Sequence, residues 1–343
     1  MRYSKAILDV LDGNFARFDQ MFCNQADGIG ILKEASRNRV LYAFCDKLIK
    51  NRSGSIGPFL EETVRRVLAD GDLWQLKLRN TLLFINSFFS QHNVPYLVVK
   101  TYRSIPYVTF DVDVLVHPSD FTFVYSKLKE IGELGKHPGK QTKKQVNFFA
   151  SNQLTVDLHE NFSWQGSTYL DDSFAWMNTR KQEIAGVVCP IPSAEVETIL
   201  EAAHLLFERR YITLLDYIYL RRMSEKPLDG QAIHKQVQCH GWDDAFTSLL
   251  ATVNEINYFF EGTELNPALL ARNGELSVKE FDMPYFLSPL AVVKIFYEKY
   301  RKQDYFPKFD FLYYFFTLTR YHISGKRRYP YYIEWFSPEK IRL

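Results

Sequence analysis

The sequence is poor in the features that mark exported, disulfide-bonded or zinc-binding proteins. Its 343 residues include four cysteines, Cys23, Cys45, Cys189 and Cys239, and none of them forms a CxxC pair. This spacing supports neither a disulfide framework nor a structural zinc site. The first residues carry charges throughout and lack the continuous apolar core of a signal peptide. We therefore expect a protein of the reducing cytoplasm.

Long hydrophobic runs and an excess of one charge are missing as well. The longest charge-free stretch, Asn80–Val99, contains His92, Pro95 and several amide and hydroxyl side chains, so it is not typical of a membrane span. Lys and Arg number 42 and Asp and Glu 40, which leaves a formal net charge of +2. This balance requires neither a nucleic acid nor a membrane as partner, and we expect no membrane partner.

Three common nucleotide-binding and hydrolase motifs are also absent. The sequence contains no GxxxxGK[S/T] phosphate loop, no GxGxxG after a strand and no GxSxG elbow. P-loop, Rossmann and α/β-hydrolase folds are therefore unsupported. The composition is otherwise that of a folded protein, with 46% apolar, 24% charged and 16% aromatic residues, which excludes intrinsic disorder.

Helical periodicity fills the first part of the chain, and strand patterns follow it. Apolar residues recur at three and four positions up to His92, which predicts helices. Short β-rich runs lie at Tyr96–Lys100 and Val112–Val116, and helix-start residues precede an amphipathic helix at Phe121–Ile131. The alternation of helix and strand signals is therefore confined to the middle of the chain.

The remaining strand signals also lie in the middle of the chain. The runs QVNFFAS and LTVDLHEN, separated by the turn-prone Ser151-Asn152, predict a hairpin, and EIAGVVCPIP from Glu183 predicts one more strand. From Ser193 the pattern is helical almost to the end. We predict an α+β fold, a small mixed sheet flanked by helices, with an N-terminal helical region at 1–92, a core at 93–192 and a C-terminal helical domain at 193–343.

Three acidic residues in these strands are candidate metal ligands. Asp111 and Asp113 are two apart at the start of a strand, so their side chains point to the same side. Two such carboxylates repel each other unless a cation lies between them, and Mg²⁺ is commonly held by one or two carboxylates together with substrate phosphates. Asp157 lies in the second strand of the predicted hairpin, where it can join the pair as a third carboxylate. Solvated acids at strand ends are the alternative explanation.

The same segments resemble a known family. VVKTYRSIPYVTFDVDVLV at 98–116, followed by TVDLHENF, resembles the uncharacterised nucleotidyltransferase-like family of the polymerase-beta nucleotidyltransferase superfamily. The family pattern is a strand ending in Lys-Gly, a spacer, Asp-x-Asp-Leu-Leu-Val and then an acid-Leu-His. A later helical segment matches the family with His204 near its middle and Asp216 about a dozen residues on. The resemblance covers roughly Pro95–Trp242.

The resemblance implies a polymerase-beta-like core and a reaction. A nucleoside monophosphate would pass from an NTP to an acceptor hydroxyl, with pyrophosphate released and Mg²⁺ or Mn²⁺ as cofactor. Asp111 and Asp113 would then be metal ligands, Asp157 the third catalytic and metal-binding carboxylate, and Lys100 with Thr101 the turn that faces the triphosphate. The acceptor is left open among a small molecule, a protein and RNA.

This chain departs from the family pattern in the turn before the acids. It has Thr101 where the family has Gly, and glycine is used there because the backbone approaches phosphate closely. The spacer often carries an Arg shortly before the first acid, and here the nearest one is Arg103, which we take as a nucleotide-binding candidate. A degenerate member that binds a nucleotide or a protein is therefore an alternative to an active enzyme. A kinase-like transferase with similar acids is another.

Several further residues have both a functional and a structural explanation. His159 shares a strand face with Asp157 and either orients it, binds the acceptor or is a structural histidine. We expect His204 to be a buried helix residue and Asp216 to pair with Arg209 or Arg210. The basic residues near 136–144 and 326–328 are candidates for acceptor RNA, although such clusters are more often solvated surface.

Overall fold

The computed structural model describes residues 2–21, 25–53, 55–130, 145–148, 153–164, 167–266, 283 and 285–287. Within these ranges, no helix has the length and hydropathy needed to cross a membrane. The helices are α1 (Arg2–Leu11), α2 (Ala16–Met21), α3 (Gln25–Arg37), α4 (Leu41–Arg52), α5 (Pro58–Gln91), α6 (Pro118–Glu130), α7 (Asp172–Met177), α8 (Ala194–Ala203), the π-helix η1 (His204–Arg209), α9 (Leu214–Ser224), α10 (Gly230–Cys239) and α11 (Asp243–Glu261). The strands are β1 (Tyr96–Val99), β2 (Asp111–Val116), β3 (Gln145–Phe148), β4 (Thr155–His159), β5 (Phe162–Trp164), β6 (Ser167–Leu170), β7 (Thr179–Ile184), β8 (Val187–Pro192), β9 (Tyr211–Ile212) and β10 (Tyr285–Phe286).

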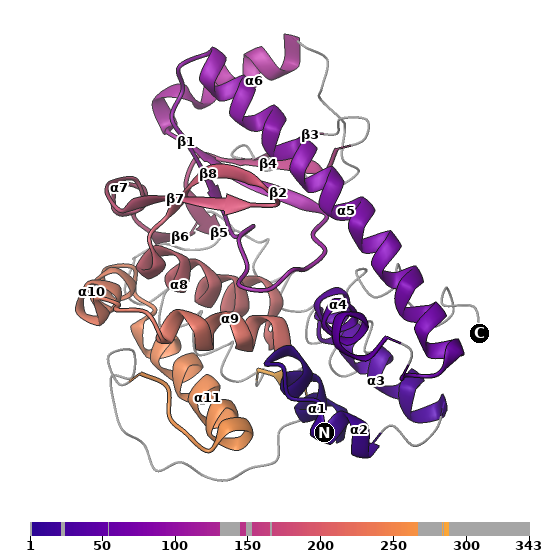
Figure 1. Cartoon of the computed structure of the whole chain (residues 1–343). Helices are drawn as coiled ribbons and strands as arrows, with labels where there is room; N and C mark the ends of the chain where they lie inside the picture. Colours follow the sequence, from indigo (N-terminus) through magenta and orange to yellow (C-terminus); the bar gives the residue numbers. More distant parts are fainter. Residues whose placement is uncertain are drawn as a thin grey trace, which may run out of the picture.

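A four-stranded mixed sheet forms the centre of the molecule. Its strand order is β1-β2-β4-β3, with β1 antiparallel to β2, β2 parallel to β4 and β4 antiparallel to β3. Helices lie on both sides of it, with α6 and the C-terminal half of α5 above and α8 and α9 below in the view of Figure 1. The small mixed sheet and the flanking helices confirm the α+β fold predicted from the sequence.

The alternation of side chains along β2 divides its residues between two cores. Val112, Val114 and Val116 point towards α5 and α6 and join a core that also contains Leu82 of α5. Leu115 points the other way, into the core that is built around α8 and α9. Because successive strand residues face opposite sides, Asp111 and Asp113 share the face of Leu115 and are directed towards the α8 side.

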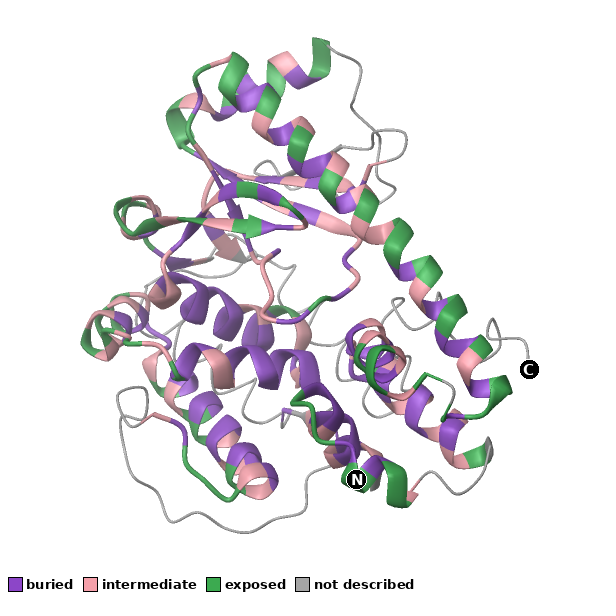
Figure 2. Ribbon diagram, in the orientation of Figure 1, coloured by how far each residue is buried: buried purple, intermediate pink, exposed green. Residues whose placement is uncertain are grey.

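The helices below the sheet are buried along most of their length, whereas one side of α5 is exposed (Figure 2). Every residue of α8 from Val196 to Ala203 is buried, including Glu201, and α9 is buried from Leu214 to Leu220. Carboxylates in such helices need partners, because an unpaired charge is costly to remove from water. These acids are therefore expected to lie in ion pairs, as described below.

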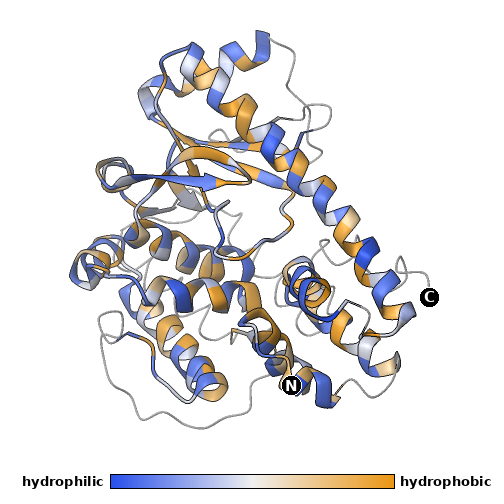
Figure 3. Ribbon diagram, in the orientation of Figure 1, coloured by the Kyte–Doolittle hydropathy of each residue, from blue (hydrophilic) through white to orange (hydrophobic). Residues whose placement is uncertain are grey.

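Helix α5 is 34 residues long and carries hydrophobic segments along its whole length (Figure 3). Its N-terminal part packs on α4 through residues such as Leu60 and Val64, in the same core as Phe44. Its C-terminal part lies against the sheet through Leu78 and Leu82. The helix thus contributes to both cores, and it ends where Asn93 adopts a positive φ of 52° before β1.

The crossing of α4 and α5 is close at Gly71. A Cβ atom built at Gly71 would overlap the ring of Tyr42, whose hydroxyl donates a hydrogen bond to Asp72 at 2.6 Å. Ala is a better helix former than Gly by roughly 1 kcal/mol, but overpacking a fitted contact costs about 1–3 kcal/mol. We expect Gly71→Ala to lower the melting temperature in a thermal denaturation experiment. Asp70→Ala, at an exposed neighbouring position, is the control, and a higher melting temperature for Gly71→Ala would contradict the prediction.

Two sequence expectations need correction. The strand predicted from Glu183 is part of a hairpin of two strands, β7 and β8, which turn at Ala185 and Gly186, both with positive φ. The region after Ser193 is not purely helical, because β9 pairs with β10. In addition, α8 continues into a π-helix, η1. Short strands such as β9 and β10 are set by pairing between distant segments, which local periodicity does not detect.

Other sequence expectations hold or are left as they were. The strand at Tyr96–Lys100, the helix near Phe121–Ile131 and the β3–β4 hairpin are confirmed to within a few residues. The three-part division at residues 92 and 192 stays a prediction. The basic residues near 136–144 and 326–328 lie outside the described residues.

Candidate functional site

The three acids lie on one face of the sheet. Strands β2 and β4 run parallel, and Asp113 is the register partner of Asp157, so these two residues are neighbours across the strand pair. Asp111 lies two residues before Asp113 on the same face, opposite Thr155. Their strands alternate between half-buried acids and fully buried apolar residues. The structure therefore places Asp157 on the same face of the sheet as Asp111 and Asp113.

The pKa values of Asp111 and Asp113 shift in opposite directions. Burial raises the pKa of Asp111 to about 6, and the nearby charge of Asp113 adds to the shift. Burial also acts to raise the pKa of Asp113, but the hydrogen bond and charge of His159 and the charge of Lys100 outweigh it, so the net shift is downward. A carboxyl that takes up a proton beside an ionised neighbour is typical of two acids with too little positive charge between them.

His159 completes the row on β4. It lies two residues beyond Asp157, on the same face, and its Nε2 lies 2.6 Å from Oδ1 of Asp113. The ring therefore reaches across to the neighbouring strand, and its contact is with one of the two acids of the Asp-x-Asp pair. The face predicted for His159 is confirmed, and its ring holds the carboxylate of Asp113 through this contact.

The raised pKa of Asp111 predicts that removing its charge stabilises the protein at neutral pH but not at acidic pH. The folded protein binds this proton more tightly than the unfolded chain, so the contribution of Asp111 to stability falls as pH rises from about 4 through about 6. Without divalent cations, Asp111→Asn should melt a few degrees above wild type at pH 7.5 and close to wild type at pH 4. Asp244→Asn, at an exposed position on α11, is the control. An equal effect of Asp111→Asn at both pH values would contradict the prediction.

The acids fit a divalent cation by their chemistry. Carboxylate oxygens are the ligands that Mg²⁺ and Mn²⁺ prefer, and burial together with the charge of Asp113 raises the pKa of Asp111. Among the described residues, no group of three His, Cys, Asp or Glu side chains is arranged to hold a metal. His159 contacts Oδ1 of Asp113, so a cation at this oxygen would need to take the place of that hydrogen bond.

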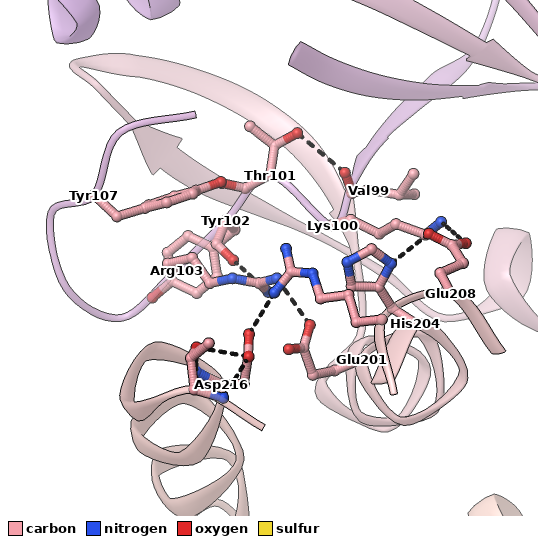
Figure 4. Close-up of polar contacts among 12 residues, drawn as sticks. Val99, Lys100, Thr101, Tyr102, Arg103, Tyr107, Glu201, His204, Glu208 and Asp216 are labelled. Carbon is pink, nitrogen blue, oxygen red and sulfur yellow. Dashed lines mark hydrogen bonds and ion pairs between the residues drawn. The ribbon is translucent and has the colours of Figure 1, made fainter. Parts of the chain in front are cut away.

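Lys100 lies at the end of β1, beside the acids. Its φ of 56° is in the left-handed region, which is uncommon for a residue with a side chain and turns the chain sharply after Val99. Only 11% of its side chain is exposed, and its Nζ lies 3.3 Å from Oε1 of Glu208 (Figure 4). Burial acts to lower its pKa, but the charge of Glu208, with those of Tyr169 and Asp113, gives a net upward shift. Lys100 is therefore a charged ammonium on the acid side of the sheet.

Thr101 closes the turn from inside. It is 2% exposed, its hydroxyl donates to the carbonyl of Val99 at 3.1 Å, and the hydroxyl oxygen accepts from the amide of Asp113 at 3.3 Å. Tyr107 donates to the Thr101 carbonyl at 2.8 Å. The residue that replaces the family glycine thus ties β1 to the acid-bearing strand. The prediction that Thr101 contacts a nucleotide stays a prediction.

Arg103 is anchored in the interior. Its guanidinium lies 2.8 Å from Glu201 of α8, and the two side chains are 4% and 1% exposed (Figure 4). It also stacks over the ring of Tyr219 at 4.5 Å. This ion pair gives Glu201 the partner that its burial requires and fixes the loop before Asp111 to the helical layer. The expectation that Arg103 binds the nucleotide stays a prediction, and the structure gives it a clear packing role.

The sequence reasoning missed Glu208. It lies in η1, four residues after His204, and joins two groups: its Oε1 contacts Lys100, and its Oε2 lies 2.5 Å from Nδ1 of His204. Burial lowers the pKa of His204 to about 4, so the ring is neutral near pH 7. The signal in the sequence is the His-x-x-x-Glu spacing on a helical segment, which places both side chains on one face.

Asp216 has the structural role expected from the sequence. It is fully buried, its Oδ1 accepts from Arg209 at 2.8 Å, and its Oδ2 accepts from the hydroxyl and amide of Thr213 in the capping box that begins α9. Burial acts to raise its pKa, but the charges of Arg209 and Arg39 produce a net lowering. Of the two expected partners, Arg209 is confirmed.

The comparison with known families agrees with the motif. The sequence model of a family described as "Uncharacterised nucleotidyltransferase" matches residues 25–257. Among solved structures, the chain is similar to a lincosamide antibiotic adenylyltransferase, LnuA, in its lincomycin-bound crystal structure. The identity is 14%, the match covers 42% of this chain and 94% of that chain, and the TM-score is 0.31. No curated protein sequence matches the chain.

The family match is wider than the segment that carries the motifs. The motifs alone place the resemblance at Pro95–Trp242, whereas the match begins in α3 and ends in α11, so it includes most of the N-terminal helices and every acid of the candidate site. It spans well over half of the 343 residues. The chain therefore belongs to the family of uncharacterised nucleotidyltransferases.

Proposed function

We propose that the protein is an active nucleotidyltransferase that moves a nucleoside monophosphate from an NTP to an acceptor hydroxyl. The observation that carries the proposal is the parallel register of Asp113 and Asp157, with Asp111 on the same face and Lys100 at the end of the adjacent strand. In-line phosphoryl transfer needs positioning and neutralisation of charge more than covalent chemistry, and three acids with a nearby ammonium can supply both.

The residues have separate roles in this proposal. Asp111 and Asp113 hold Mg²⁺ or Mn²⁺, joined by Asp157. The cation, when bound, neutralises charge on the phosphates. Asp157 accepts a hydrogen bond from the attacking hydroxyl, orients its oxygen towards the α-phosphorus and takes up its proton as the new bond forms. As the new P–O bond forms, the bond from the α-phosphorus to the bridging oxygen breaks and pyrophosphate leaves, close to the ammonium of Lys100.

The acceptor class and the location belong to the same proposal. A small molecule, a protein and RNA each offer a hydroxyl, and the small net charge of +2 gives RNA no advantage. The scattered cysteines agree with a cytoplasmic protein, where NTPs and Mg²⁺ are available.

A binding module without turnover is the second candidate. Two observations favour it: the hydroxyl of Thr101 is engaged inside the turn where the family has glycine, and Asp113 is engaged by His159. In such a protein, the sheet would hold a nucleotide or a protein partner, and the acids would do no chemistry.

Thermal unfolding with nucleotides tests the proposal without knowledge of the acceptor. Wild type and the double variant Asp111→Ala/Asp113→Ala are melted with each of the four NTPs, with and without Mg²⁺ or Mn²⁺, because a ligand that binds the native state raises the midpoint. We expect a cation-dependent rise with at least one NTP that the double variant loses. An unchanged midpoint with every NTP at millimolar concentration would overturn the proposal and favour a protein-binding module.

A further inference from the structure

A line of three polar side chains leads from the π-helix to the acids. Nδ1 of His204 lies 2.5 Å from Oε2 of Glu208, and the other oxygen of Glu208 lies 3.3 Å from Nζ of Lys100. Lys100 in turn follows Val99, the register partner of Asp113 on the neighbouring strand. Figure 4 shows Lys100 from the end of β1 and His204 from η1 meeting at Glu208. Both oxygens of Glu208 are thus engaged, one by a neutral ring and one by the ammonium.

The neighbours of this line hold it in a buried frame. Tyr169 lies near Lys100 and is 3% exposed, and its ring stacks on Phe207 of η1 with 6.0 Å between the ring centroids. The Tyr169 carbonyl accepts from Nε1 of Trp242 at 3.0 Å, and Trp242 lies edge-on to Phe207 at 5.4 Å. Packed aromatic contacts of this kind leave little freedom to the groups between them.

The exposures distinguish this contact from a surface salt bridge. The side chains of Lys100, His204 and Glu208 are 11%, 17% and 33% exposed. A surface pair contributes little because water competes with both partners, whereas the ammonium of Lys100 is almost removed from water and depends on its protein partners. Glu208 carries the larger accessible surface, so the group opens towards solvent on its side.

We propose that Glu208 is the positioning residue of Lys100, holding its ammonium at the acids so that it binds the β- and γ-phosphates of the NTP. This inference rests on the proposed function. An ammonium has three N–H donors, and Glu208 accepts from one of them, so the ammonium can also donate to phosphate oxygens. Protein kinases use the same division of labour, in which a glutamate on a helix holds the strand lysine that binds phosphate.

The π-helix explains why a glutamate reaches this position. Helix α8 passes directly into η1, whose turns contain more residues than those of an α-helix. The next residue, Arg210, has a φ of 63° and donates a hydrogen bond from its amide to the carbonyl of Leu205. Isolated π-turns inside helices are frequent at functional sites. Here the wider turn carries His204 and Glu208 together next to the end of β1.

The test compares triphosphate with monophosphate binding. Wild type, Glu208→Gln, Lys100→Ala and the double variant are titrated with Mg²⁺ and the NTP that gives the largest thermal shift, and then with its monophosphate. We expect Glu208→Gln to weaken NTP binding by about 10- to 100-fold, the range for losing a hydrogen bond to a charged group, and to leave NMP binding unchanged. The double variant should bind the NTP no more weakly than Lys100→Ala, because the two residues act as a unit.

Two further variants separate positioning from folding. Glu197→Gln breaks a different ion pair, that of the buried Glu197 of α8 with Arg180, which is not part of the line to Lys100. It should lower the melting temperature and leave the ratio of NTP to NMP affinity unchanged. Glu208→Asp keeps the charge on a shorter side chain and should give an intermediate loss of NTP binding. It also serves as the test if Glu208→Gln does not fold.

The outcomes distinguish this inference from the proposed function. Tighter NTP binding by Glu208→Gln would mean that Glu208 competes with phosphate for Lys100, and it would overturn the inference. Equal losses for NTP and NMP would indicate a structural role, and additive losses in the double variant would indicate independent residues; either result would overturn it as well. If wild type binds no NTP, both the inference and the proposed function fail. Wild-type binding that Glu208→Gln leaves intact rejects the inference alone.

Discussion

Asp113→Asn is expected to slow the formation of NMP and pyrophosphate from an α-labelled NTP by on the order of 10³-fold. Asp113 is the centre of the candidate site, because it faces Asp157 in register, lies on the face of Asp111 and accepts from His159. Water can replace the natural acceptor in a slow reaction, so the rate is measurable under single-turnover conditions with Mg²⁺. The amide keeps the volume of the side chain but removes the charge that would bind the cation.

The control for this experiment is Asp244→Asn, an exposed acid on α11, which should keep the wild-type rate. A second label identifies the reaction class. Transfer of the α-phosphorus marks a nucleotidyltransferase, whereas transfer of the γ-phosphorus marks a kinase-like enzyme. Undiminished NMP formation in Asp113→Asn would rule out the assigned role of the acids.

Asp216→Ala is expected to lower the free energy of unfolding by about 3–5 kcal/mol. The substitution removes the partner of Arg209 at a fully buried position and also breaks the capping box of α9. Arg209 would be left beside Arg39 without the carboxylate that offsets their charges. Urea denaturation followed by circular dichroism measures the loss, and nucleotide binding of the remaining folded protein should change much less than in Asp113→Asn.

A matched control separates the ion pair from the helix cap. Asp229 caps α10 by accepting from the amide of Ala232 at 3.0 Å, and it is exposed. Asp229→Ala therefore removes a cap without a buried ion pair and should cost about 1 kcal/mol. Similar losses in Asp216→Ala and Asp229→Ala would show that the buried pair with Arg209 contributes little.

The sheet and the acid face could be predicted because both follow from local rules. A strand alternates its side chains with period two, so Asp111 and Asp113 had to share a face once β2 was recognised. The hairpin of β3 and β4 was marked by its turn residues, and it placed Asp157 on a strand that could pair with β2. What the sequence could not supply was the register that makes Asp113 and Asp157 neighbours.

The part of the site contributed by the helical layer could not be predicted in the same way. Glu208 and Lys100 are 108 residues apart, and no local pattern states which helix packs on the acid side of the sheet. For Arg103, its position shortly before the acids in the sequence suggested nucleotide binding. In the structure, its guanidinium forms an ion pair with Glu201 at 2.8 Å. The ion-pair partners of buried charged residues are determined by three-dimensional packing, which sequence periodicity does not predict.

The long helix α5 ties the folding of the two cores together. At roughly 1.5 Å per residue its 34 residues form a shaft of about 50 Å, with one end in the N-terminal helices and the other behind the sheet. The middle of α5 also contacts the loop that leads to Asp111. Gln75 donates a hydrogen bond to the carbonyl of Tyr107 at 2.6 Å, and the rings of Trp74 and Phe110 pack edge to face. Hydrogen exchange should therefore find that the amides at both ends of α5 open in one cooperative unit. Loosening of the distant N-terminal helices would then also loosen the face that carries Asp111 and Asp113.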